Sequence, residues 1–86
     1  MTYFNASTAG TYNVKPGMGT LVGIVINNTA AGAITIYNEN SAVATTKIAT
    51  LKASIGEGSY NFFGVPFTTG LTVVTAGASD VTVIYT

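Results

Sequence analysis

The chain of 86 residues contains three lysines and three acidic residues, so charged residues make up 7% of it and the formal net charge is zero. It has no arginine, histidine, cysteine or tryptophan. So few lysines cannot neutralise the phosphates of a nucleic acid. Without histidine or cysteine, neither a zinc site nor a base-activated nucleophile is expected. We therefore predict no enzymatic activity, no cofactor, no metal site and no nucleic-acid partner.

The length predicts a single domain over residues 1–86. Its thin core has neither disulfides nor a metal to support it, which favours association with copies of itself. The N-terminal residues form neither a basic nor a continuous apolar stretch, so we expect no secretory signal. The longest apolar run, residues 21–26, is far shorter than the roughly twenty residues of a membrane-spanning helix. We expect a soluble protein, made in a cytoplasm, with no membrane partner.

Turn residues recur between short segments rich in β-branched and aromatic residues, which is typical of strands. The turn at 28–32 predicts a hairpin between the segments on either side of it. A longer connection is expected at 64–70, because Pro66 lacks the N–H that a strand needs. In chain order, the expected strands are residues 2–6, 11–14, 19–28, 33–37, 46–51, 58–63, 71–75 and 81–86.

The predicted hairpin of residues 19–37 should supply much of the core. Side chains alternate along a strand, and the paired strands of a hairpin share faces. One buried face should therefore hold Val22, Ile24, Ile26, Ile34 and Ile36.

Residues 41–53 are the segment in which a helix competes with a strand, because four alanines and two lysines lie there. Its β-branched content favours a strand over 46–51. The remaining segments lack uninterrupted helical periodicity. Seven or eight short antiparallel strands therefore predict an all-β fold, a small sandwich or barrel.

All three acidic residues, Glu39, Glu57 and Asp80, fall in predicted turns. A carboxylate pair for acid–base chemistry could come only from these residues. Acids in such turns more often solvate the loop or bond to local backbone amides, and Asp80, just before a strand, fits the second role. We therefore predict no catalytic pair and no metal site among them.

Nine aromatic residues make up 10% of the chain. On the strand 58–63, Tyr60 and Phe62 share one face and Phe63 points to the other. Aromatic side chains on both faces of a small sandwich indicate a core on one side and an interface on the other. The alternative is an aromatic platform that stacks on sugar rings.

The C-terminal third, residues 64–85, contains the pattern F-x-x-G-L-x-V-x-T-x-G-x-x-D-x-T-V-x-Y. It resembles the ending of small virion proteins of tailed phages. Residues 19–38 are similar to the strand pair of those proteins that ends in G-x-I-T-I-Y-N. The resemblance implies a capsid decoration (cement) protein: a jelly-roll β-sandwich, often a homotrimer, bound to the major capsid protein on the virion surface. No catalytic residues come with it.

Two functions from different classes therefore stay open. The first is a structural virion protein that decorates a capsid. The second is a carbohydrate- or receptor-binding β-module of a tail or head fibre. An exposed coplanar pair of aromatic side chains beside Asn or Asp would favour the second, whereas aromatic side chains buried in a core or a subunit interface would favour the first.

Overall fold

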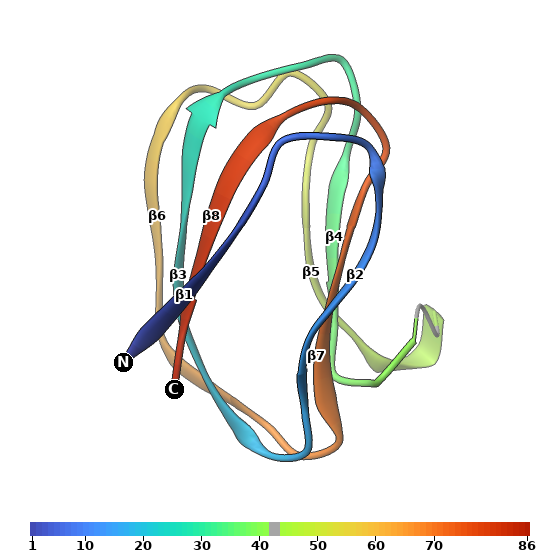
Figure 1. Ribbon diagram of the computed structural model, residues 1–86, viewed down its shortest axis with the longest axis vertical. Coiled ribbons are helices and arrows are strands. Elements are labelled where there is room, and N and C mark those ends of the chain that lie inside the picture. The colour runs from blue at the N-terminus through green and yellow to red at the C-terminus, as the bar shows by residue number, and fades with distance from the viewer. Residues whose placement is uncertain (42–43) are drawn as a thin grey trace.

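The computed structural model describes residues 1–41 and 44–86, and its strands form two antiparallel sheets packed face to face (Figure 1). The predicted all-β sandwich is confirmed. The helical part of the described residues is one 3-10 turn at Ala44–Thr46. In chain order the strands are β1 (Thr2–Ala6), β2 (Gly10–Pro16), β3 (Gly19–Asn28), β4 (Ile34–Tyr37), β5 (Lys47–Leu51), β6 (Gly58–Phe67), β7 (Gly70–Thr75) and β8 (Asp80–Tyr85).

The strand order is β1-β8-β3-β6 in one sheet, called sheet A below, and β2-β7-β4-β5 in the other, sheet B. Each strand of the first half pairs with its counterpart counted from the other end of the chain: β1 with β8, β2 with β7, β3 with β6 and β4 with β5. The chain is thus one long hairpin wrapped around a core, which is the jelly-roll arrangement.

Both sheets contribute to one apolar core. Ile24 and Ile26 come from β3, and Ile34 and Ile36 come from β4, each at most 2% exposed. The full set of buried apolar residues is Ala6, Leu21, Ile24, Ile26, Ile34, Ile36, Phe67, Leu71, Val73, Val81 and Val83. The four isoleucines share a core as predicted, but they face one another across it and do not lie side by side on one sheet.

The hairpin predicted at residues 28–32 is wrong. β3 pairs with β6 and β8, whereas β4 pairs with β5 and β7, so the segment between them crosses from sheet A to sheet B. Contacts with the distant β7–β8 connection hold this crossing in place. The Ala30 N–H donates to Ser79 Oγ at 3.1 Å, and the Ala76 N–H donates to the Ala33 carbonyl at 3.0 Å.

Val22 was predicted in the core and is not part of it. The register of β3 shifts between Leu21 and Gly23, on both its β6 and its β8 side. This bulge reverses the alternation, so Leu21 is fully buried and Val22 is only half-buried.

The predicted connection at 64–70 is also wrong, because β6 continues to Phe67 and contains Pro66. β6 is an edge strand of sheet A. A proline is tolerated there, since one side of the strand needs no ladder hydrogen bonds. The helix considered for 41–53 is replaced by the 3-10 turn and β5, and residues 42–43 lie outside the described residues.

Candidate functional site

The three acidic residues lie apart and bond to different groups. Glu57 Oε2 accepts from the Thr29 N–H at 3.1 Å, and Glu39 Oε1 accepts from the neighbouring Asn40 N–H at 3.3 Å. We predicted that Asp80 bonds to local backbone amides, and the structure shows a different arrangement. The Asp80 carboxylate accepts from the side-chain amides of Asn5 at 2.8 Å and Asn27 at 3.4 Å.

These bonds belong to a polar network on the outer face of sheet A. Asn5 Nδ2 on β1 also lies 3.0 Å from the Val81 carbonyl and 3.1 Å from Thr82 Oγ1. Asn27 Nδ2 on β3 reaches the same Thr82 hydroxyl at 3.1 Å. The network fixes β1 and β3 to β8 from the solvent side, and it leaves the Asp80 carboxylate bonded within the sheet.

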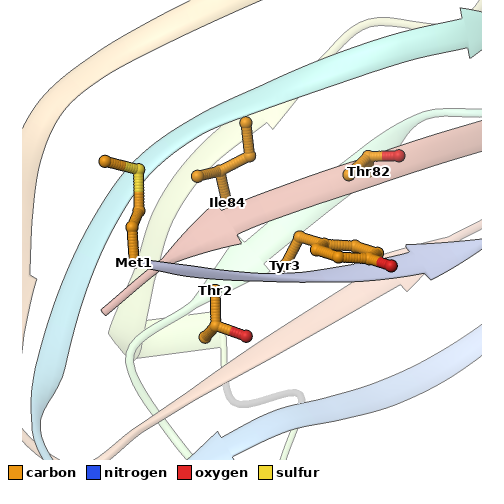
Figure 2. Close-up of a pocket in the computed structure, with 5 residues that line it drawn as sticks. All are labelled: Met1, Thr2, Tyr3, Thr82 and Ile84. Carbon is orange, nitrogen blue, oxygen red and sulfur yellow. The ribbon is translucent and has the colours of Figure 1, made fainter.

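Beside this network lies an apolar corner, formed by Met1, Tyr3 and Ile84 with Thr82. Tyr3 on β1 stands directly opposite Ile84 on β8. Figure 2 shows Met1, Tyr3, Thr82 and Ile84 on one side of this strand pair, while Thr2 points to the other. They line a shallow depression in which Met1 is 86% and Tyr3 71% exposed.

The opposite edge of sheet A presents a single large aromatic side chain. Phe63 on β6 is 87% exposed, and its backbone φ of 55° lies in the left-handed region that large side chains seldom adopt. Gly64 follows with φ 76°, and the Phe63 N–H donates to Asn61 Oδ1 at 2.7 Å. The β3–β6 register shifts here, so a bulge turns Phe63 outward.

The two sheets differ in charge. Asp80 is the one charged residue within the four strands of sheet A. The strands of sheet B contain Lys15 and Lys47 and no acid. Sheet A therefore combines an almost uncharged face with exposed Met1, Tyr3 and Phe63.

The aromatic side chains fall on both sides of β6, as predicted. Tyr60 and Phe62 pack against the core, and Phe63 points to solvent. What the sequence analysis missed is the bulge that exposes Phe63 and the amide network around Asp80. The glycine after two phenylalanines was the available signal for the bulge, because glycine supplies positive φ in irregular strands.

Comparisons with known proteins found no match to a protein-family model, to a curated protein or to a solved structure. Over residues 1–41 and 44–86, no cluster of acids, histidines or cysteines could hold a metal ion. Within the same ranges, no helix is long and apolar enough to cross a membrane.

Proposed function

We propose that this chain is a structural assembly protein, and specifically a capsid decoration protein that binds assembled phage heads and copies of itself. The observation that carries the proposal is the outer face of sheet A, where large apolar side chains are held in solvent on strands with a single charge. The phage context comes from the resemblance of residues 19–38 and 64–85 to small virion proteins.

Loss of water from the outer face of sheet A favours a protein contact there. Covering apolar surface is favourable by roughly 25 cal/mol per Å², and charged groups oppose it when they lose water. Covering sheet A would bury apolar surface and would desolvate few charges, since its one carboxylate is already bonded to Asn5 and Asn27. The bulge fixes the backbone at Phe63 before binding, which reduces the entropy lost on association.

Contact with Phe63 would contribute most to the binding energy of a partner. Large aromatic side chains dominate the binding energy of protein interfaces when they enter a pocket. Here the bulge holds the ring away from its own core, and the Asn61 side chain stabilises that backbone. A strained backbone that displays an apolar side chain is an arrangement found at binding sites.

Carbohydrate binding is the second candidate, because exposed Tyr3 lies on the same face as Asn5 and Asp80. Two features weigh against it. Asn5 Nδ2 donates to Asp80 Oδ1, so these two atoms are already engaged within the sheet and only the remaining oxygens of the two side chains could orient a sugar. The other exposed aromatic side chain, Phe63, lies three strands away, or roughly 14 Å at the usual strand spacing.

Co-sedimentation with heads that lack the protein tests the proposal. The wild type should pellet with heads and not with isolated capsid subunits, because several copies engage several neighbouring subunits at once. Phe63→Ser should weaken pelleting, while Met18→Ser, at a residue 71% exposed in the β2–β3 turn, should leave it unchanged. Specific retention on a glycan array without binding to heads would overturn the proposal in favour of the sugar-binding function.

A further inference from the structure

Four strands form the edges of the two sheets, and three of them carry features that discourage pairing with another chain. β2 contains Lys15, Pro16 and a register shift. β5 begins at Lys47, and β6 contains Pro66 and the Phe63 bulge. Charges, prolines and bulges are the usual means by which proteins protect open sheet edges.

β1 has none of these features. Its sequence Thr-Tyr-Phe-Asn-Ala lacks charge, proline and glycine, and its register with β8 runs without a shift from Thr2 to Ala6. β1 pairs with β8 on one side only, and no other backbone hydrogen bond of the described residues involves it. Every second residue of such a strand directs its N–H and C=O groups to the open side.

We infer that the open edge of β1 pairs antiparallel with β1 of a second copy, which joins two A sheets into one continuous sheet across a twofold axis. An antiparallel strand pair is self-complementary, so one edge can serve both partners. β1 brings no charged side chain to the contact, whereas β2 and β5 would each bring a lysine from both copies.

The residues around β1 are compatible with a second copy as the partner. In the paired sheet the two Asp80 carboxylates would lie at least three strand spacings apart, more than roughly 14 Å, where salt screens them. On the outer face, the exposed side chains of Met1 and Tyr3 would lie beside the second β1. Cross-strand contacts between them would add apolar area to a ladder of only five residues.

This inference rests on the self-association part of the proposed function, and it gives a dimer where the resemblance implies a trimer. Binding to heads is a separate property. A chain that stays monomeric and still pellets with heads would remove the inference and leave the proposed function. A dimer that does not bind heads would support the inference and contradict the proposed function.

Light scattering across the micromolar range tests the pairing. The wild type should have twice the chain mass of 8.8 kDa, and Tyr3→Lys should have the single mass, because a lysine from each copy would then lie on the same face of the new strand pair. Met18→Lys is the matched control, since Met18 and Tyr3 are both 71% exposed and Met18 lies off the edge. It should remain a dimer.

Mixing variants excludes a folding defect as the explanation. Tyr3→Glu alone should also be monomeric, whereas equal amounts of Tyr3→Lys and Tyr3→Glu should recover the double mass. A monomeric wild type, a threefold mass, or a Tyr3→Lys variant that stays dimeric would each overturn the inference.

Discussion

The two edge strands of sheet A belong to the same sheet and differ in almost every feature that controls binding. β1 is short, regular and uncharged, and it leaves backbone groups open along its outer side. β6 is twice as long, but Pro66 and the Phe63 bulge interrupt it. One edge is suited to adding a strand and the other to presenting a side chain. A single sheet can therefore serve two kinds of contact, one at each edge.

A substitution in β3, an interior strand of sheet A, should have the largest effect on stability. Ile24 on β3 is 1% exposed and lies between Tyr60 of β6 and Val83 of β8. Ile24→Ala should lower the free energy of unfolding by about 2–5 kcal/mol, because the cavity cannot fully collapse. Urea denaturation measures this, with Val25→Ala as the outward-facing control. A loss below about 0.5 kcal/mol would contradict the described core.

Gly23→Ala should disturb β6, the edge strand at the opposite side of sheet A from β1. A Cβ at Gly23 would lie 2.9 Å from the Tyr60 carbonyl oxygen, so β6 would have to move away from β3. We expect a loss of about 1–3 kcal/mol, as for other overpacked sites. Gly10→Ala is the control, because its Cβ would meet only the end of the Tyr12 side chain at 3.4 Å. Equal stability of the two variants would show that the close approach is not a constraint.

Replacing Phe63 should have a smaller effect with the opposite sign. Phe63→Gly relieves a φ of 55°, which costs a residue with a side chain about 1–2 kcal/mol. Glycine loses about 0.5–1 kcal/mol more chain entropy on folding, so the free energy of unfolding should rise by a net amount of about 0.5–1 kcal/mol. Phe63→Ala keeps the unfavourable backbone and should bring no such gain. The glycine variant should also lose binding to heads. A loss of stability in Phe63→Gly would mean that the ring supports the fold and is not held for a partner.

Salt should have the smallest effect on the β1 contact, because β1 carries no charge and Asp80 lies one strand away. The dimer dissociation constant should change by less than a factor of about two between low and moderate salt. Sedimentation equilibrium at both salt concentrations measures it. A steep salt dependence would indicate a contact through the lysines of sheet B.

Local sequence patterns predicted most strands because turn residues and β-branched residues are local signals. Residues 2–6 and 19–28 were predicted with the bounds of β1 and β3. The pairing of β3 with residues 33–37 was wrong, since the same Asn- and Gly-containing segment can close a hairpin or cross between sheets. What decides is the pairing of β3 with β6 and β8 and of β4 with β5 and β7, which joins residues far apart in the sequence, as does the hydrogen bond from Ala30 to Ser79.

The two parts of the candidate site were predictable to different degrees. Alternation along β6 was enough to separate Phe63 from Tyr60 and Phe62, but it could not show the bulge, which depends on the register with β3. The open edge of β1 could not be found before the strand order was known. Which strands lie at the edges of a sheet follows from long-range pairing, and nothing in the sequence Thr-Tyr-Phe-Asn-Ala marks it as an edge.

Amide hydrogen exchange at two protein concentrations tests most directly whether the two edges are used differently. As concentration rises, the amides of Thr2–Ala6 should exchange more slowly because a second β1 covers their open side. The amides of Gly58–Phe67 should exchange at the same rate at both concentrations. Slower exchange in β6 with no change in β1 would contradict the account and assign self-association to the other edge.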